Sequence, residues 1–432
     1  RYACKADIEK AFLQVEIAEE DRDALRLLWI NDGVVVVLRF ARLPFGLTCS
    51  PFLLAAVLQK HLNSSEIDQE LIDEILAAFY VDDNVWSVDT FKELMHRQEV
   101  TLEEFSKAGM KLRQWNANND QAREHFRQLG DDPPDVETVL GLKWDVNKDL
   151  ISINAERIEG LVGQQPKTKR QFWSFVAQIF DPLGLLAPYT ALAKMLTREV
   201  SAVCKSWDSK LPVELSSRVT KWMEEFLLIP TVTFPRHVSI VNPKSEWLVS
   251  YCDASTKGLG VGIYLRSEDQ EGKVIIRLIT GKSRIAPHPA QTIPRLELMG
   301  AVLSVNVMSH VKKAFPWIPA DRIYYFSDSR NVIFWIYSGS MSWPTFIANR
   351  RKSILELSEM SQWAHVSTEE NSADLPSRGC SLSELRDSDL WNYGPDYLYK
   401  GVECGKSTVD GYRLASSNLK DAEAPEGCVQ EL

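Results

Sequence analysis

The segment between residues 247 and 366 constrains the fold of this chain most strongly, because it has a distinctive order of elements. Hydrophobic patterning and turn residues predict three consecutive strands at 247–253, 258–265 and 274–282. After them we expect a long helix at 295–315, a strand at 323–327, helices at 329–337 and 345–360, and a last strand at 362–366. Consecutive strands form hairpins, whereas strands separated by helices form crossovers. The pattern therefore predicts a mixed sheet with helices packed on it.

The first part of the chain predicts a separate unit. A strand is expected at residues 4–8, and Asn31-Asp32-Gly33 predicts a hairpin over 27–40, because Asp-Gly favours tight turns. A helix is expected at 51–62 with Ser50 as its N-cap, and another at 92–108, closed by Gly109. With 432 residues the chain has room for two to four domains, so we expect a multidomain protein of the α/β and α+β classes.

Two adjacent carboxylates lie in a predicted turn between two short strands, in Tyr80-Val81-Asp82-Asp83. By itself such an acidic turn is common. Asp7, however, also follows directly after a short apolar strand, far upstream. If neighbouring strands bring Asp7 to the turn, three carboxylates form a site for two divalent cations, which suits phosphoryl transfer.

Three segments, in this order, resemble the motifs of reverse transcriptases: Lys-Ala-Asp-Ile-Glu-Lys-Ala-Phe at 5–12, Leu-Pro-Phe-Gly-Leu-Thr-Cys-Ser-Pro at 43–51, and Tyr-Val-Asp-Asp at 80–83. The resemblance implies a partial polymerase palm in which three catalytic carboxylates hold two Mg²⁺ or Mn²⁺ ions: Asp7, Asp82 and Asp83. It implies nucleotide contacts by Phe12, Phe45, Gly46 and Tyr80. Phe12 would exclude a ribose 2′-hydroxyl, or it would be a core aromatic residue. Residues 139–144 resemble the primer-gripping hairpin of the family.

Asp7 lies almost at the start of the sequence. The basic fingers that grip the triphosphate in this family are therefore expected to be missing, and we expect no processive DNA synthesis by this chain alone.

Four further carboxylates occupy distinctive places in the later segment. Asp253 and Asp328 end strands, Glu297 lies early in the long helix, and Asp374 lies in Asn-Ser-Ala-Asp-Leu-Pro-Ser-Arg at 371–378. Singly, Glu297 could be a partner of the helix dipole and Asp328 an N-cap. The glycines of 257–262 do not open a helix, so they do not indicate a dinucleotide cofactor.

Together these residues resemble the ribonuclease H family, and the Asn-x-Ala-Asp-x-x-Ser-Arg segment is similar to its retroelement branch. The resemblance implies a ribonuclease H-like mixed sheet with flanking helices. It also implies that Asp253, Glu297, Asp328 and Asp374 are catalytic and hold two Mg²⁺ or Mn²⁺ ions, so that a metal-activated water hydrolyses RNA in an RNA–DNA hybrid. His365 is expected to be a structural strand residue.

Three more segments, at 172–188, 294–298 and 391–395, resemble the Bel/Pao class of long-terminal-repeat retrotransposon pol polyproteins. The domains expected from this resemblance are a truncated palm and thumb at 1–135, a connecting Pao-type region at 136–244 and a ribonuclease H-like domain at 245–380. A C-terminal extension that is largely disordered at its end is expected at 381–432. The connecting region of this class carries the label of a Pao retrotransposon peptidase. The chain contains no Asp-Thr-Gly or Asp-Ser-Gly, so we predict no aspartic-protease centre.

The implied partners are an RNA template, a DNA primer, an RNA–DNA hybrid, dNTP substrates and the remainder of the pol polyprotein. A net charge of −10 does not indicate binding of nucleic acid by bulk charge alone. No apolar run reaches the roughly 20 residues of a membrane span, so no membrane partner is expected. Seven scattered cysteines without a Cys-x-x-Cys pair fit a reducing compartment. We expect an intracellular, cytoplasmic protein, in a virus-like particle if the element is intact.

Two functions from different classes fit these observations. The first is a pol enzyme that combines an RNA-directed DNA polymerase, truncated here, with a ribonuclease H. The second is a catalytically inert relic or an adopted nucleic-acid-binding module. The presence of all seven carboxylates favours the first.

Overall fold

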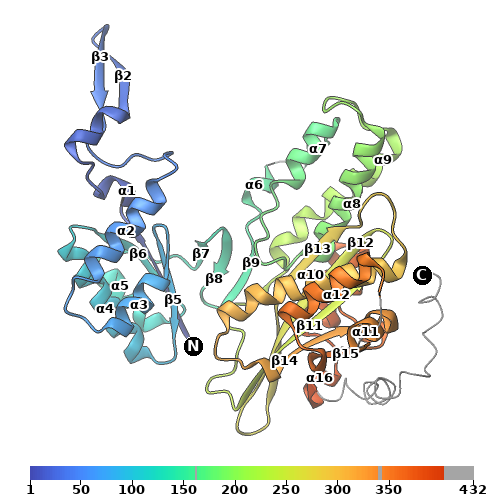
Figure 1. The fold of residues 1–432 in the computed structure, drawn as a ribbon. Coiled ribbons are helices and arrows are strands. Elements are labelled where there is room, and N and C mark those ends of the chain that lie inside the picture. Colours follow the sequence, from blue (N-terminus) through green and yellow to red (C-terminus); the bar gives the residue numbers. More distant parts are fainter. Residues whose placement is uncertain (161–162, 339–342, 403–432) are drawn as a thin grey trace. The chain divides into compact units, whose positions relative to one another are not determined.

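The computed structural model describes residues 1–160, 163–338 and 343–402 of the chain (Figure 1). The described residues form two compact units, one from Arg1 to Leu150 and one from Ile151 onward. The end of the predicted C-terminal extension, residues 403–432, lies outside the described residues. Among the residues described, no helix has both the length and the hydrophobicity that crossing a membrane requires.

The first unit is built on a four-stranded sheet with the order β4-β5-β1-β6. Its strands are β1 (Tyr2–Ile8), β4 (Phe79–Tyr80), β5 (Asp83–Val88) and β6 (Leu112–Ala117). The helices of this unit are α1 (Ala11–Gln14), α2 (Ser50–Leu62), α3 (Gln69–Ala77), α4 (Phe91–Lys107) and α5 (Asp120–Gln128). β1 is antiparallel to both β5 and β6, so it lies in the interior of the sheet. The hairpin of β7 (Val136–Val139) and β8 (Leu142–Asp145) follows.

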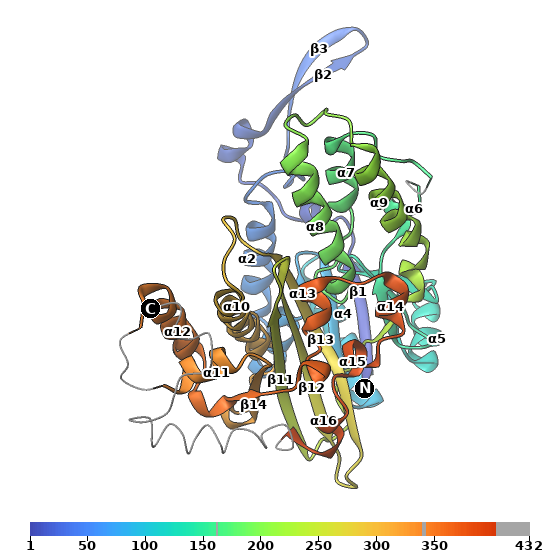
Figure 2. The same ribbon diagram turned by 90° about the vertical axis from the view of Figure 1, so that its right-hand side faces the viewer.

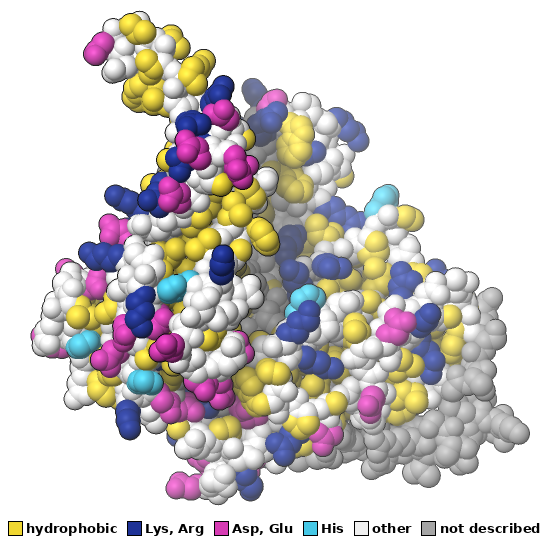
Figure 3. Space-filling view, turned by 60° about the vertical axis from the view of Figure 1, so that its left-hand side comes forward, with side chains coloured by type: hydrophobic (Ala, Val, Ile, Leu, Met, Phe, Trp, Pro, Cys, Tyr) yellow, Lys and Arg dark blue, Asp and Glu magenta, His cyan; other side chains and the backbone are white. Residues whose placement is uncertain are grey.

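Local signals of the first unit are confirmed with one exception. The predicted hairpin is formed by β2 (Arg26–Asn31) and β3 (Val34–Arg39), and Asp32 and Gly33 both have positive φ. Its apolar side chains are exposed and form the hydrophobic lobe that protrudes in Figure 3. The predicted N-cap is wrong: Cys49 is the N-cap of α2, and Ser50 is its first residue. The Ser50 hydroxyl donates instead to the Pro44 carbonyl at 2.8 Å, so it fixes the preceding loop.

The second unit contains a five-stranded mixed sheet with the order β13-β12-β11-β14-β15. Its strands are β11 (Ser245–Ala254), β12 (Gly258–Glu268), β13 (Val274–Ile285), β14 (Ile323–Ser327) and β15 (Trp363–His365). The first three are antiparallel, whereas β11, β14 and β15 run parallel. The predicted order of elements and the mixed sheet are confirmed.

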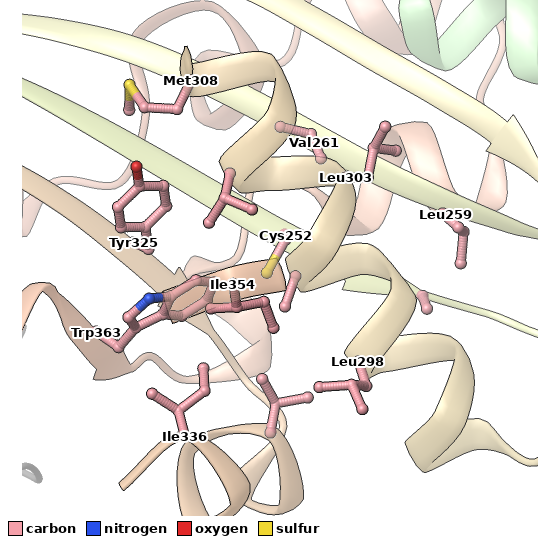
Figure 4. Close-up of a cluster of buried hydrophobic side chains, with 14 of the residues drawn as sticks. Cys252, Leu259, Val261, Leu298, Leu303, Met308, Tyr325, Ile336, Ile354 and Trp363 are labelled. Atoms are coloured by element: carbon pink, nitrogen blue, oxygen red, sulfur yellow. The ribbon is translucent and has the colours of Figure 1, made fainter. Parts of the chain in front are cut away.

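Helices cover both faces of this sheet, and side chains of β12 alternate between them. One face packs against α10 (Ile293–Ala314), α11 (Arg330–Tyr337) and α12 (Thr345–Leu357). The core on this face includes Leu259, Val261 and Ile263 and is shown in Figure 4. Gly260 and Tyr264 face the opposite side, because their neighbours belong to the C-terminal helices. These are α13 (Asp374–Arg378), α14 (Leu382–Arg386), α15 (Asp389–Tyr393) and α16 (Tyr397–Lys400), of which α13 and α15 are seen beside the strands in Figure 2.

A helical segment before the sheet belongs to the same compact unit. It begins within β9 (Leu150–Ile153), whose first residue is the last of the first unit. It then contains α6 (Glu156–Glu159), α7 (Lys169–Val176), α8 (Ala187–Val203), α9 (Val213–Glu224) and β10 (Phe234–Pro235). The Asp181 carboxylate accepts the backbone N–H groups of Leu185 and Leu186 just before α8. The Leu183 carbonyl accepts the Gly281 N–H at 3.0 Å, so this segment covers the outer edge of β13. Covering an edge strand protects it from pairing with other chains.

Candidate active sites

The first candidate site lies where β1 ends and β5 begins. Asp7 is the register partner of Asp83 in the antiparallel pair, and the Ile8 N–H donates to the Asp82 carbonyl at 3.2 Å. The turn before β5 contains Val81 with a φ of 60°, which is strained for a β-branched residue. Such strain is found where a turn is held in place for function. The structure thus brings Asp7, Asp82 and Asp83 together, although Asp7 is remote from the pair in sequence.

The carboxylates of this site repel one another. Burial raises the pKa of Asp7, and the charges of Asp82 and Asp83 raise it further. Arg113 lowers it, with its Nε 3.7 Å from Asp7 Oδ2. Burial also raises the pKa of Asp83. A bound cation would relieve this repulsion by stabilising the ionised carboxylates.

A buried lysine for which no role was predicted balances part of this charge. Lys5 is 5% exposed, and its Nζ lies 3.1 Å from Glu137 Oε1 and 4.0 Å from Asp83 Oδ1. Nζ also donates to the Thr138 carbonyl at 3.1 Å. Lys5 thus ties β1 to β7 and lowers the pKa of Asp83. Its position two residues before Asp7 on an interior strand is the only sequence signal for this role.

The residues predicted to contact nucleotide lie around this site in two environments. Phe45 and Tyr80 are exposed, while Phe12 is buried and meets the Phe45 ring edge-on at a centroid distance of 4.9 Å. Gly46 has a φ of +92°, which a side chain would strain. Phe12 is therefore part of the core, and its contact with an incoming sugar stays a prediction.

The second candidate site lies at one end of the mixed sheet. β11 and β14 are parallel with Cys252 opposite Ser327, so the next residues, Asp253 and Asp328, follow at neighbouring strand ends. Glu297 is in the first two turns of α10, which covers one face, and Asp374 begins α13 on the other. Carboxylates from both faces therefore converge on the strand ends.

Neighbouring polar side chains hold three of these carboxylates. The Ser377 hydroxyl donates to Asp253 Oδ2, and the Ser329 hydroxyl donates to Glu297 Oε2 at 2.5 Å. Asn371, which is fully buried, donates through Nδ2 to Asp328 Oδ1 at 3.1 Å and to the Cys252 carbonyl at 3.0 Å. Arg378 binds the fourth carboxylate, with Nε 2.6 Å from Asp374 Oδ1.

Sequence reasoning assigned no role to these supporting residues. The signal for three of them was present, because Asn371, Ser377 and Arg378 belong to the same Asn-x-Ala-Asp-x-x-Ser-Arg segment as Asp374.

Burial governs the protonation of this site. It raises the pKa of Asp253 to about 6 and that of Glu297 to about 7, while the hydrogen bonds from Ser377 and Ser329 act in the opposite direction. The charge of Asp328 raises both values. Burial raises the pKa of Asp374 too, and Arg378 lowers it. A bound cation would therefore stabilise the ionised forms of Asp253, Glu297 and Asp374.

Gly260 explains the glycine-rich segment of β12. A Cβ at this position would lie 2.3 Å from the Ala373 carbonyl oxygen and 2.6 Å from the Ser377 nitrogen. Only glycine therefore lets α13 approach β12 closely enough to bring Asp374 and Ser377 to Asp253. The predicted absence of a helix after these glycines is confirmed, since they lie within a strand.

His365 has a structural contact. Its Nε2 lies 3.1 Å from the Asp328 backbone carbonyl, and burial lowers its pKa. The histidine thus supports the loop that carries Asp328, as expected for a residue of β15.

The donors at both sites suit a hard divalent cation. Each site offers only carboxylate oxygens, which Mg²⁺ and Mn²⁺ accept together with water and substrate phosphate. Within the described ranges, no group of three or more His, Cys, Asp or Glu side chains already has the arrangement to hold a metal ion. The carboxylates are held instead by Arg113, Ser377, Ser329 and Arg378, and their metal-binding role stays a prediction.

Comparison with known families matches both units. Residues 1–115 match the family model described as reverse transcriptase (RNA-dependent DNA polymerase). Residues 168–329 match the model described as Pao retrotransposon-like RNaseH-like domain, which includes the helical segment from α7 and the sheet as far as the residue after Asp328. No curated protein matches the chain significantly.

Proposed function

This chain belongs to the pol proteins of the Bel/Pao class of long-terminal-repeat retrotransposons, and on that basis we propose that its second unit is a ribonuclease H that cleaves the RNA strand of RNA–DNA hybrids. The observation that carries the proposal is the convergence of four carboxylates at one end of the sheet. Asp253 and Asp328 come from adjacent parallel strand ends, and Glu297 and Asp374 come from helices on opposite faces.

The chain's own residues prepare this site. Hydrogen bonds orient three of the carboxylates: Ser377 donates to Asp253, Ser329 to Glu297 and Asn371 to Asp328. Each of these carboxylates therefore loses little conformational freedom when it binds a metal ion. Two Mg²⁺ or Mn²⁺ ions held by the four carboxylates would activate a water molecule and stabilise the charge of the cleaved phosphodiester. Because burial raises the pKa of Asp253 and Glu297, both must lose their protons before they can serve as ligands.

We propose further that the first unit holds the polymerase centre, with Asp7, Asp82 and Asp83 as its metal ligands. The register pairing of Asp7 with Asp83 supports this assignment. RNA template, DNA primer and dNTP would be its substrates. The test is Mg²⁺-dependent incorporation of single nucleotides on primed poly-rA: the parent chain should add one or a few nucleotides without processive synthesis, and the Asp83→Asn variant should add none.

The ribonuclease H proposal is tested with a labelled RNA–DNA hybrid in the presence of Mg²⁺. Asp328→Asn should lower the cleavage rate about a hundredfold or more while the protein stays folded, because it removes one ligand charge without changing shape. Asp321→Asn is the matched control, since Asp321 is exposed near the opposite end of β14. Double-stranded DNA should be spared.

Two outcomes would contradict the proposal. If Asp328→Asn cleaves as fast as the parent, the two-metal assignment fails. If the parent binds the hybrid but cleaves it with neither Mg²⁺ nor Mn²⁺, the result favours an inert nucleic-acid-binding module over a ribonuclease H.

A further inference from the structure

Two exposed tryptophans meet on the helical segment of the second unit. Trp173 lies on α7 and is 39% exposed, and Trp207 lies between α8 and α9 and is 49% exposed. Their ring centroids are 6.0 Å apart, with an interplanar angle of 74°. Such exposed aromatic surface is unfavourable in water and indicates a site of interaction.

The two stretches that carry these rings are held together by their backbones. The Arg170 N–H donates to the Trp207 carbonyl at 2.8 Å, and the Lys169 N–H donates to the Ser209 carbonyl at 3.2 Å. A third bond runs from the Leu211 N–H to the Lys167 carbonyl. Residues 167–173 and 205–210 therefore form one ordered surface, which we call the Trp173–Trp207 surface.

This surface is strongly basic although the chain as a whole is acidic. It carries five cationic side chains and one carboxylate: Lys167, Lys169, Arg170, Lys205 and Lys210, with Asp208. Lys169 Nζ lies 5.1 Å from the centre of the Trp207 ring, and Arg170 binds Asp208 through two nitrogens. The remaining three lysines are exposed.

The position of two of these cations is electrostatically costly. Lys169 and Arg170 lie in the first turn of α7, which contains no acidic residue. The positive end of a helix dipole favours acidic residues in this turn and disfavours cations. Asp208 offsets the charge of Arg170, while an anion bound nearby would also stabilise Lys169. The surface is thus suited to a polyanion.

We propose that the Trp173–Trp207 surface binds a single strand of nucleic acid, with bases on the indole rings and phosphates on the surrounding lysines. Stacking on exposed aromatic rings requires unpaired bases, which a duplex does not offer. An acidic peptide would use the cations but would leave the flat rings without a partner. The surface shares no residue with either carboxylate cluster, so its proposed role goes beyond the proposed cleavage function.

The test measures binding of fluorescently labelled dT20 to the full chain by anisotropy, in EDTA, so that metal-dependent contacts do not contribute. The Trp173→Leu/Trp207→Leu double variant should weaken binding about tenfold or more, since stacking contributes on the order of 1–3 kcal/mol per base. Trp207→Phe should retain most of the affinity, because it keeps a flat ring. Trp317→Leu is the control, since Trp317 is 59% exposed and lies in the same unit.

The charge contribution is tested by the salt dependence. Each phosphate contact to a single strand contributes roughly 0.7 to the slope of log K against log salt concentration. The Lys167→Gln/Lys205→Gln/Lys210→Gln variant should therefore lower the slope by about 2 if all three lysines contact phosphates.

Two results would overturn the inference. In the first, the double tryptophan variant binds dT20 as tightly as the parent does. In the second, a blunt 20-base-pair duplex competes with labelled dT20 as effectively as unlabelled dT20 does. Cleavage of a blunt hybrid by the double variant, measured in parallel, should stay at the parent rate. Failure of this inference therefore leaves the ribonuclease H proposal untouched, and Asp328→Asn should bind dT20 normally.

Discussion

Gly260→Ala perturbs the second candidate site without touching any carboxylate. The added Cβ would lie 2.3 Å from the Ala373 carbonyl oxygen, 2.6 Å from the Ser377 nitrogen and 2.9 Å from Pro376 Cγ. Two of these are backbone atoms that cannot rotate away, so α13 must move outward by roughly 1 Å to restore ordinary contact distances. Asp374 and Ser377 move with it.

The expected cost has two parts. Overpacking a well-packed interface costs about 1–3 kcal/mol, and losing the Ser377 hydrogen bond to the Asp253 carboxylate costs about 1.5–3 kcal/mol. Because α13 can move to relieve the clash, we expect the free energy of unfolding of the second unit to fall by about 3 kcal/mol. Displacement of catalytic groups by about 1 Å should lower the rate of hybrid cleavage about a hundredfold.

Urea unfolding followed by tryptophan fluorescence measures the first effect, and cleavage of a labelled hybrid in Mg²⁺ measures the second. Gly160→Ala is the matched control, because no atom lies within 4 Å of the added Cβ and the φ of Gly160 is −64°. If Gly260→Ala unfolds and cleaves like the parent, the close approach of α13 to β12 is not what builds the site.

Two further predictions concern pH and a buried charge. Because burial raises the pKa of Asp253 to about 6 and that of Glu297 to about 7, the folded state binds more protons than the unfolded state between about pH 4 and pH 7. The free energy of unfolding in EDTA should therefore fall by a few kcal/mol as pH rises through that range, and Asp253→Asn/Glu297→Gln should flatten the dependence measured by urea unfolding. In the first unit, Lys5→Met should destabilise the fold by about 3 kcal/mol, because it removes the cation that neutralises the largely buried carboxylate of Glu137. A double-mutant cycle with Glu137→Gln measures the coupling, and additive effects would show that the pair contributes nothing.

The sequence predicted the fold where local signals and topology agree. Asp32-Gly33 was sufficient for the β2–β3 hairpin, because few residue pairs adopt positive φ so readily. The order of strands and helices after Trp247 predicted the mixed sheet, since parallel neighbours require crossovers. Asp253 and Asp328 were found because both end strands that such a topology places side by side.

Features that depend on contacts between distant segments were not predictable. The sequence pattern of residues 207–226 is compatible with one continuous helix, yet α9 covers only Val213–Glu224, because Trp207 and the residues after it pair with the start of α7. The roles of Gly260 and Lys5 depend on what approaches them from elsewhere in the chain. The sequence shows a glycine and a lysine within strands, and only the structure shows α13 and Glu137 beside them.

We propose that the carboxylates at the end of the mixed sheet hold divalent metal ions. Anomalous scattering from crystals of the chain grown with Mn²⁺ and an uncleaved RNA–DNA hybrid tests it most directly. Two manganese peaks are expected among Asp253, Glu297, Asp328 and Asp374, each roughly 2 Å from carboxylate oxygens. A hybrid bound at this end of the sheet with no manganese between these four residues would contradict it.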